Sequence, residues 1–311
     1  PMVRTSDILD IMLAYNPDTD TDIVQRAYIY SARVHEGQVR LSGEPYLSHP
    51  LEVAGILADM KLDSVCISAG LLHDVLEDTS ATEDDLGEMF GEEVLKIVKG
   101  LTKLSALPYN SAQARQADSI RKMILAMADD IRVILIKLVD RLHNMRTLEY
   151  QKEHKKQRIA RETMDIYAPI AARLGIYWIK SELEEIGFKT LHPEEYASIT
   201  SKISNDKNER EVYIDSVREY LLEKLEENGL KGEVVGRHKQ IYSIYHKMMT
   251  QELPFDEIYD IIAFRIILGS VQECYEALGI VHSLWRPIAK KFKDCAIGRS
   301  IALPDRHHRK A

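Results

Sequence analysis

The chemically most informative residues of this 311-residue chain lie between His73 and Asp78. His73 and Asp74 are adjacent, and Glu77 and Asp78 follow one helical turn later. On a helix, adjacent side chains are ~100° apart, so a histidine and a carboxylate in this order could converge on one ion. Side chains four residues apart share a helix face, so the second pair would lie over the first. We predict a helical metal site with two further carboxylates; the alternative is a His-Asp pair that caps or bridges core helices.

Two distant residues extend this set. His49 precedes Pro50 at the entrance of a predicted helix, and Asp140 ends the apolar run 131–139. A buried carboxylate without a partner is costly, so Asp140 needs a cation or donor nearby. We interpret Lys137 as a side chain whose stem packs on the run while its ammonium reaches solvent; the alternative is a contact with the ligand. Two histidines and two carboxylates make a mixed nitrogen and oxygen ligand set that suits Mn²⁺, Fe²⁺ or Zn²⁺: His49, His73, Asp74 and Asp140.

The elements that must position these residues are predicted to be helices. Apolar residues recur at three- and four-residue spacing through most of the first two-thirds of the chain, which indicates amphipathic helices. Glycine and proline fall between the periodic segments and separate them. The predicted helices cover residues 21–35, 50–60, 63–76, 119–127, 131–148 and 157–174.

The pattern changes beyond residue 193. Residues 194–228 form a heavily charged helical stretch that ends at Gly229, and we interpret it as a connector between domains. Strand-like residues 232–235 and the apolar run 261–268 follow; the predicted helices here cover 240–250 and 271–284. A continuous apolar run of this length is typical of a buried strand in an α/β sheet.

Composition excludes several classes of protein. The chain is 45% hydrophobic and 29% charged, which is typical of a globular protein and too apolar for disorder. We find no apolar stretch near the ~18 residues that a membrane-spanning helix needs, and no secretory signal. The three cysteines are widely separated and predict neither a disulfide framework nor a zinc finger. We therefore expect a cytoplasmic protein of about two domains, without a membrane partner.

Charge is distributed unevenly along the chain. The net charge is −8, yet residues 231–311 carry 13 Lys and Arg against 9 Asp and Glu. An acidic body repels the phosphate backbone of nucleic acids, so we expect no direct nucleic-acid partner. A metal ion could still recruit a small phosphorylated ligand to the acidic part, and the basic part suits phosphate groups.

Three segments resemble the hydrolase domain of the RelA/SpoT family, whose members make and degrade the alarmone (p)ppGpp. They are residues 40–50 (Arg-Leu-Ser-Gly-Glu-Pro-Tyr-Leu-Ser-His-Pro), 73–79 (His-Asp-Val-Leu-Glu-Asp-Thr) and 140–147 (Asp-Arg-Leu-His-Asn-Met-Arg-Thr). The similarity extends into the family's synthetase domain through residues 161–170, 236–248 and 260–265, and it covers residues 20–294 in all.

The resemblance implies a mainly α fold. It predicts an all-helical His-Asp (HD-type) metal hydrolase domain over residues 1–193, the helical connector over 194–229, and a partial α/β nucleotidyltransferase-like synthetase domain over 230–311. It also implies that Glu77 and Asp78 activate or orient the water that attacks the 3′-pyrophosphate. The manganese ligands that it implies are His49, His73, Asp74 and Asp140.

Four residues resemble the family's nucleotide-contacting positions near the guanine base and sugar: Arg40, Ser42, Asn144 and Thr147. Position 41 is Leu, where some relatives carry a basic residue. The alternative for Arg40 is a solvated loop arginine. The alternative for Asn144 and Thr147 is capping of the helix surface or hydrogen bonding back to the helix backbone.

In the family, the synthetase transfers pyrophosphate from ATP to GDP or GTP. The resemblance implies a phosphate site at Arg237, Lys239, Ser243 and Lys247, with Asp260 as a Mg²⁺ ligand; the alternative for the basic residues is a solvated helix face. After residue 294 the resemblance ends, because 295–311 contain neither the family's Gly-Tyr-Gln-Ser segment nor its later catalytic glutamate. We therefore expect an incomplete, inactive synthetase.

The resulting hypothesis is manganese-dependent hydrolysis of the 3′-pyrophosphate of (p)ppGpp to GDP or GTP, in control of the stringent response. The expected partners are ppGpp or pppGpp and GDP or GTP, with ATP at the synthetase part. Two alternatives stay open: another His-Asp phosphohydrolase acting on dNTPs or cyclic nucleotides, and a catalytically silent guanine-nucleotide sensor. Glu77 and Asp78 argue against the sensor, since a pure binder needs no additional carboxylates facing a polyanion.

Overall fold

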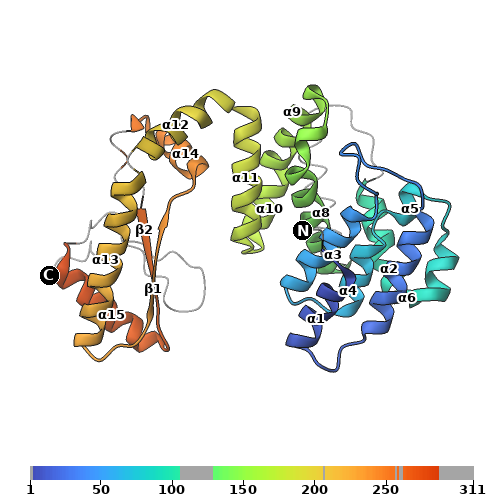
Figure 1. The fold of residues 1–311 in the computed structure, drawn as a ribbon, viewed down its shortest axis with the longest axis horizontal. Coiled ribbons are helices and arrows are strands. Elements are labelled where there is room, and N and C mark those ends of the chain that lie inside the picture. Colours follow the sequence, from blue (N-terminus) through green and yellow to red (C-terminus); the bar gives the residue numbers. More distant parts are fainter. Residues whose placement is uncertain (1–2, 106–128, 206, 256–257, 259–261, 287–311) are drawn as a thin grey trace. The chain divides into compact units, whose positions relative to one another are not determined.

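The computed structural model describes residues 3–105, 129–205, 207–255, 258 and 262–286. Contacts within the chain divide it into two units, Pro1–Pro193 and Glu194–Ala311, and each is described by itself (Figure 1). The described part of the first unit is built of helices, and that of the second combines helices with a two-stranded sheet. The prediction of a mainly α fold is confirmed.

Helices account for most of the first unit. The predicted helices over 21–35 and 131–148 are confirmed with small shifts at their ends, whereas 119–127 lies outside the described residues. The predicted helix over 157–174 corresponds to three consecutive helical segments, the middle one a π-helix. The elements are α1 (Thr5–Tyr15), α2 (Thr21–Val34), α3 (Ser48–Asp59), α4 (Ser64–Leu71), α5 (Val75–Asp78), α6 (Glu83–Ser105), α8 (Ile131–Arg146), η1 (Leu148–Tyr150), α9 (Glu153–Glu162), η2 (Thr163–Tyr167), α10 (Ala168–Arg173) and α11 (Tyr177–Leu191).

Aspartate side chains define where three of these helices begin. Asp20, Asp63 and Asp130 precede α2, α4 and α8, and each accepts a hydrogen bond from a backbone N–H in the first turn. These bonds satisfy N–H groups that lack a partner inside the helix. Arg132 contacts Asp130 at 2.8 Å and Asp63 at 3.0 Å, which joins the starts of α4 and α8. The start of the helix that carries Asp140 is therefore fixed.

The core of the first unit forms where α3, α4 and α8 pack together. Along α3, every residue from Ser48 to Ala58 except Glu52 is buried. The approach of α4 to α3 is close, because a Cβ added at Gly70 would lie 2.5 Å from Leu57 Cδ1. This packing brings the start of α3, the end of α4 and the middle of α8 into one buried region.

The predicted helix over 63–76 is wrong at one point, because the chain leaves the helix between α4 and α5. The residues of this break are Leu72, His73 and Asp74. His73 Nδ1 lies 2.8 Å from the Gly70 carbonyl oxygen, so the side chain satisfies a carbonyl at the end of α4. His73 and Asp74 therefore occupy a turn rather than neighbouring positions of a regular helix.

The second unit contains an antiparallel pair of strands with helices around it (Figure 1). Within the apolar run 261–268, residues 262–267 form a strand as predicted, but the expectation of a buried strand is wrong, because half-buried and exposed residues alternate along it. Residues 194–228, interpreted as a connector, form two helices, and the second contributes Leu221 and Leu225 to the core of this unit. The elements are α12 (Pro193–Asn205), α13 (Lys207–Glu227), β1 (Glu233–His238), α14 (Ile241–Gln251), β2 (Ile262–Ile267) and α15 (Val271–Leu284).

Among the described helices of both units, none combines the length and the apolar composition that crossing a membrane requires.

Candidate metal centre

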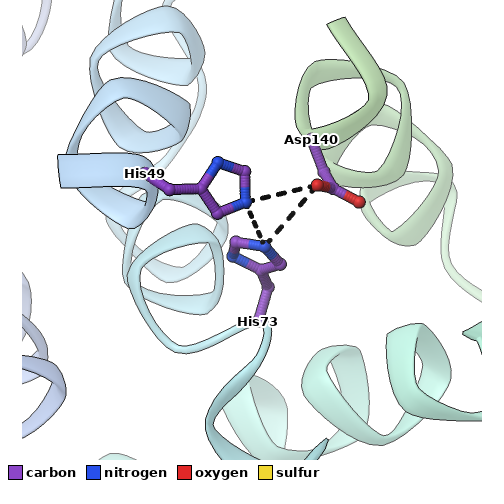
Figure 2. Close-up of side chains that lie close together, drawn as sticks. All are labelled: His49, His73 and Asp140. Carbon is purple, nitrogen blue, oxygen red and sulfur yellow. Dashed lines mark hydrogen bonds and ion pairs between the residues drawn. The ribbon is translucent and has the colours of Figure 1, made fainter. Parts of the chain in front are cut away.

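Three buried side chains from separate elements converge in the core of the first unit (Figure 2). His49 comes from the first turn of α3, His73 from the turn between α4 and α5, and Asp140 from α8. His49 Nε2 lies 3.1 Å from His73 Nε2 and 3.3 Å from Asp140 Oδ1. His73 Nε2 lies 3.9 Å from the same carboxylate oxygen. Each residue thus directs one potential ligand atom at a common point.

Asp74 adds a fourth ligand atom to this group. Its Oδ2 lies 3.0 Å from His73 Nε2 and 3.7 Å from His49 Nε2. The turn between α4 and α5 makes this contact, since it directs two adjacent side chains toward the same region. The four residues predicted as ligands are therefore brought together by the fold.

The spacing of these atoms fits a divalent ion. With metal–ligand distances of ~2.1 Å, neighbouring ligand atoms are ~3.0 Å apart in octahedral and ~3.4 Å apart in tetrahedral geometry. The five distances above run from 3.0 to 3.9 Å. Two imidazoles and two carboxylates form a donor set that divalent transition metals accept. The ligand atoms of His49, His73 and Asp140 all lie within 4.8 Å of one another, and Asp74 contacts the two histidines of this group, so the side chains and their spacing suit a divalent metal site.

The hydrogen bonds of the imidazoles leave both Nε2 atoms facing this point. The Gly70 carbonyl only accepts, so His73 Nδ1 carries the proton of that 2.8 Å hydrogen bond. His49 Nδ1 lies 2.8 Å from Nδ1 of His143, which follows Asp140 by three residues on α8. A metal-binding histidine characteristically donates its second ring N–H to an acceptor, which is the backbone carbonyl of Gly70 for His73 and the imidazole of His143 for His49.

Electrostatic interactions set the protonation of the ligands. Burial lowers the pKa of His49. Burial also lowers the pKa of His73, but the carboxylates of Asp74 and Asp140 outweigh it and raise that pKa to about 9. Burial raises the pKa of Asp140, yet the Lys137 ammonium and the two histidines hold it well below its usual range. The carboxylates are thus anionic at neutral pH, and without a metal His73 holds an extra proton.

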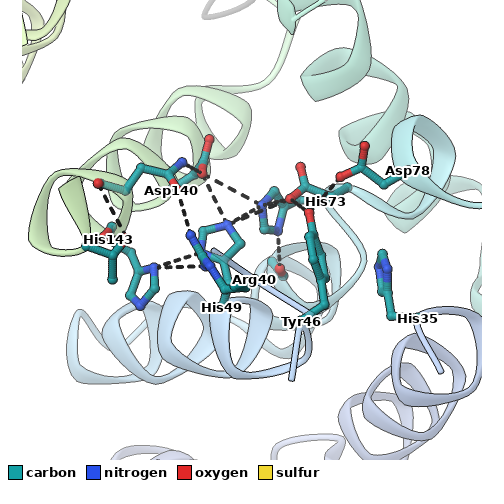
Figure 3. A network of polar contacts seen from close by, with 12 residues as sticks. His35, Arg40, Tyr46, His49, His73, Asp78, Asp140 and His143 are labelled. Atoms are coloured by element: carbon teal, nitrogen blue, oxygen red, sulfur yellow. Dashed lines mark hydrogen bonds and ion pairs between the residues drawn. The ribbon is translucent and has the colours of Figure 1, made fainter. Parts of the chain in front are cut away.

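Tyr46 connects this centre to the acidic pair on α5 (Figure 3). Its hydroxyl lies 2.7 Å from Asp74 Oδ2 and 2.7 Å from Asp78 Oδ2. The Tyr46 ring stacks on His35, with the ring centroids 4.4 Å apart. Glu77 precedes Asp78 on α5, and both side chains are exposed to solvent. The acidic pair therefore lies at the solvent side of the centre, with Asp78 tied to it through one hydroxyl.

A pocket of about 280 Å³ opens beside Asp140. Arg40, whose guanidinium donates to Asn144 Oδ1 at 3.2 Å, contributes to its wall. Thr147 Oγ1 donates to the His143 carbonyl at 3.2 Å. This is the hydrogen bond back to the helix backbone that we gave as the alternative to a nucleotide contact. All four residues predicted to contact the nucleotide line this pocket: Arg40, Ser42, Asn144 and Thr147.

The structure gives three further residues contacts in the centre that the sequence did not predict. Lys137 does not reach solvent as we expected, because its Nζ lies 2.9 Å from Asp140 Oδ2 and its side chain is only 15% exposed. That interpretation was wrong because Asp140, one turn away on the same buried face, offers the ammonium a partner. Tyr46 and His143 lie within the segments that resembled the family, yet nothing in their spacing indicated a contact with ligands.

The residues predicted for the synthetase lie in the second unit. Arg237 is part of β1, and Lys239 follows that strand directly. Ser243 and Lys247 are four residues apart on α14 and so share a face of that helix. Asp260 lies outside the described residues.

Comparison with known proteins identifies both parts of the chain. An HD domain model matches residues 27–177, and a model of a region found in RelA / SpoT proteins matches residues 236–308. A GTP pyrophosphokinase from Myxococcus xanthus is 56% identical over 293 residues, 93% of this chain and 38% of that protein. The chain belongs to the RelA/SpoT family.

Other members of the RelA/SpoT family are also similar. The bifunctional (p)ppGpp synthase/hydrolase SpoT of Escherichia coli is 46% identical over 94% of this chain and 41% of its own length. The GTP pyrophosphokinase rsh of Brucella ovis is 43% identical over 94% of this chain and 39% of its own length. The chain thus spans about two-fifths of the length of these relatives.

Two further results qualify the family comparison. The second family match continues to residue 308, further than the boundary at Asp294 that the motifs indicated. A solved structure described as a metazoan ortholog of SpoT that hydrolyzes ppGpp covers 54% of this chain and 86% of its own, with 24% identity and a TM-score of 0.37. That likeness is too low to carry an argument.

Proposed function

We propose that the first unit is a manganese-dependent hydrolase that removes the 3′-pyrophosphate of (p)ppGpp. The products are GDP from ppGpp and GTP from pppGpp, together with pyrophosphate. The observation that supports this proposal is the convergence of His49, His73 and Asp140, with Asp74 against the two histidines, which suits a divalent ion at the edge of a pocket. The relationship to a bifunctional (p)ppGpp synthase/hydrolase suggests which phosphorylated nucleotide fills that pocket.

In this proposal, the pocket residues hold the nucleoside so that only its 3′ side reaches the metal centre. Arg40, Ser42, Asn144 and Thr147 surround the base and sugar. Lys137, which lines the same pocket, offsets phosphate charge next to Asp140. Fixing the reacting group in this way converts a bimolecular encounter into a positioned one, which is a large part of catalysis.

The acidic pair on α5 supplies the proton chemistry. A bound divalent ion lowers the pKa of water and neutralises phosphate charge. Glu77 and Asp78 take the proton of the attacking water and orient it. Attack at the 3′-linked phosphorus breaks its bond to the 3′ oxygen, and that oxygen leaves with a proton. The exposed position of the pair allows it to exchange this proton with solvent.

The decisive experiment is product analysis with purified protein, ppGpp and Mn²⁺. We expect GDP and pyrophosphate, and no turnover after chelation of the metal. Cleavage at the 5′ side, or preferred turnover of dNTPs or cyclic nucleotides, would place the chain with other His-Asp phosphohydrolases. Tight binding of ppGpp without turnover would identify a sensor.

For the second unit, we propose that these 311 residues do not synthesise (p)ppGpp. Pyrophosphoryl transfer requires a positioned acceptor hydroxyl and a base, and residues 295–311 do not contain the motifs that supply them in the family. ATP and Mg²⁺ binding at Arg237, Lys239, Ser243, Lys247 and Asp260 stays a proposal. The test is to mix ATP, GDP and Mg²⁺, without Mn²⁺, with an Asp78→Asn variant, in which we expect hydrolysis of any ppGpp formed to be slowed about 10²–10⁴-fold. Accumulation of ppGpp above a control without enzyme would contradict the proposal.

A further inference from the structure

We propose that His143 is a positioning residue that fixes the orientation and tautomer of His49 toward the metal, and that Arg40 holds His143 in the acceptor state this requires. The inference rests on the proposed metal function of the centre. His143 is 8% exposed and His49 is 2% exposed, so the contact between them is shielded from water. Neither the ligand set nor the pocket residues predicted to contact the nucleotide include His143.

The contact between the two rings constrains where their protons lie. His49 Nδ1 and His143 Nδ1 are 2.8 Å apart, a distance at which one proton must lie between them. His49 directs its Nε2 at His73 and Asp140, so this atom must keep its lone pair in order to bind a metal. The proton of His49 therefore belongs on Nδ1, and Nδ1 of His143 must accept it.

Arg40 selects this arrangement (Figure 3). Its Nη1 lies 3.5 Å from the same Nδ1 of His143. A guanidinium has only donors, so a proton on His143 Nδ1 would face both an arginine N–H and His49. With that proton on its Nε2 instead, His143 accepts from His49 and faces the guanidinium with a lone pair. The two donors together fix His143 as a neutral imidazole with a free Nδ1.

Arg40 is also connected to a second ligand, Asp140, through the side chain of Asn144. Arg40 Nη2 donates to Asn144 Oδ1 at 3.2 Å, which turns the amide so that Asn144 Nδ2 donates to Asp140 Oδ1 at 2.6 Å. Two adjacent residues of α8 thus hold two ligands on different helices, His49 through His143 and Asp140 through Asn144. By contrast, His73 is held by the Gly70 carbonyl, an acceptor that no side-chain substitution removes.

The test compares two substitutions of His143 in the full chain. His143→Asn keeps an acceptor near the position of Nδ1, whereas His143→Leu fills similar space without one. The readout is Mn²⁺ affinity by isothermal titration calorimetry. We expect His143→Leu to bind Mn²⁺ roughly 10–100-fold more weakly, the usual effect of losing such an outer partner, and His143→Asn to stay close to the parent chain. Equal weakening in both variants would overturn the proposal.

A neighbouring residue provides the matched control. Leu142 is fully buried on α8, so Leu142→Ala destabilises the same helix without removing a hydrogen bond. We expect Leu142→Ala to lower the melting temperature and to leave Mn²⁺ affinity unchanged. If Leu142→Ala lost as much Mn²⁺ affinity as His143→Leu, general destabilisation of the helix would explain both losses, and a positioning role of His143 would be contradicted.

Failure of the proposed function would be visible separately. If the parent chain binds no Mn²⁺, the metal hypothesis fails, yet the protonation of His143 still tests the inference. Imidazole ¹⁵N chemical shifts of the metal-free protein report this state directly. We expect His143 with a protonated Nε2 and a free Nδ1. A proton on Nδ1 of His143, alone or together with one on Nε2, would overturn the inference.

Discussion

Asp74 and Asp78 share one hydroxyl group, that of Tyr46, whose oxygen lies 2.7 Å from a carboxylate oxygen of each. A hydroxyl has a single proton and can donate to only one of them at a time. The two aspartates belong to the two functional groups of the centre, Asp74 to the candidate ligands and Asp78 to the candidate proton acceptors. Their roles can be separated by substitutions, because Asp74 faces the histidines and Asp78 faces solvent.

Removing a ligand should abolish metal binding without unfolding the protein. In His73→Ala and Asp74→Ala, we expect loss of bound manganese and of ppGpp hydrolysis, since the remaining atoms cannot complete the ligand set. Elemental analysis measures the metal, and circular dichroism checks that the helices persist. Glu88→Ala, which changes an exposed carboxylate of α6, is the control and should keep its metal. Full metal content in either ligand variant would refute the assignment.

Replacing the acidic pair should separate binding from chemistry. Glu77→Gln and Asp78→Asn keep the size of the side chains but remove the proton acceptors. We expect unchanged affinity for Mn²⁺ and ppGpp, with kcat lowered by about 10²–10⁴, the usual contribution of general acid–base catalysis. Calorimetry and single-turnover kinetics measure the two effects. If affinity and rate fall in parallel, these residues have a structural role.

Metal binding should release a proton, and the direction in which Mn²⁺ affinity changes with pH follows from His73. In the metal-free protein, the pKa of His73 is raised to about 9, so the ring is protonated at pH 7, and only the neutral ring binds a metal. The proton must leave as the ion enters, and apparent Mn²⁺ affinity should therefore rise with pH up to about 9. The expected slope is about tenfold per pH unit for one released proton. Calorimetry in buffers of different ionisation enthalpy counts the protons, and a count of zero at pH 7 would contradict this prediction.

The sequence predicted the helices and strands better than the breaks between helices and the burial of the strands. Helical periodicity located α2, α8 and α15, because each places apolar residues at three- and four-residue spacing against the core of its unit. It missed the break before Val75, which depends on a hydrogen bond from the His73 ring to a backbone carbonyl. It also overstated the burial of β2, since an apolar run alone does not reveal whether both faces of a strand are covered.

The contacts around the ligands could not be read from spacing. His143 contacts His49, which is 94 positions away in the chain, and Tyr46 contacts Asp74, which is 28 positions away. Such pairs depend on how α3 packs on α4 and α8, and periodicity within one helix carries no information about it. Lys137 and Asp140 are only three residues apart, and there the error was to assume that a lysine beside an apolar run reaches solvent.

The ion pair of Lys137 with Asp140 yields the last prediction. Both side chains are largely buried, so Lys137→Met leaves a buried carboxylate that has lost its nearest cation. Removing one partner of a buried pair costs roughly 3–5 kcal/mol. His49 and Asn144 still contact Asp140 Oδ1, so we expect the lower end, about 3 kcal/mol, as a loss in the unfolding free energy of the metal-free protein. Urea denaturation in the presence of a chelator measures it.

Manganese should reverse most of this loss, because a bound divalent ion provides the positive charge that Asp140 has lost. We therefore expect Mn²⁺ to stabilise Lys137→Met more than the parent chain, which by linkage means that the variant binds Mn²⁺ at least as tightly. Lys180→Met is the control, since Lys180 pairs with Glu184, one turn along α11, at 2.7 Å. A partly exposed pair of this kind contributes about 0.5 kcal/mol, with or without metal. If Lys137→Met instead weakens Mn²⁺ binding, Lys137 does not act as the charge partner of a metal-binding Asp140.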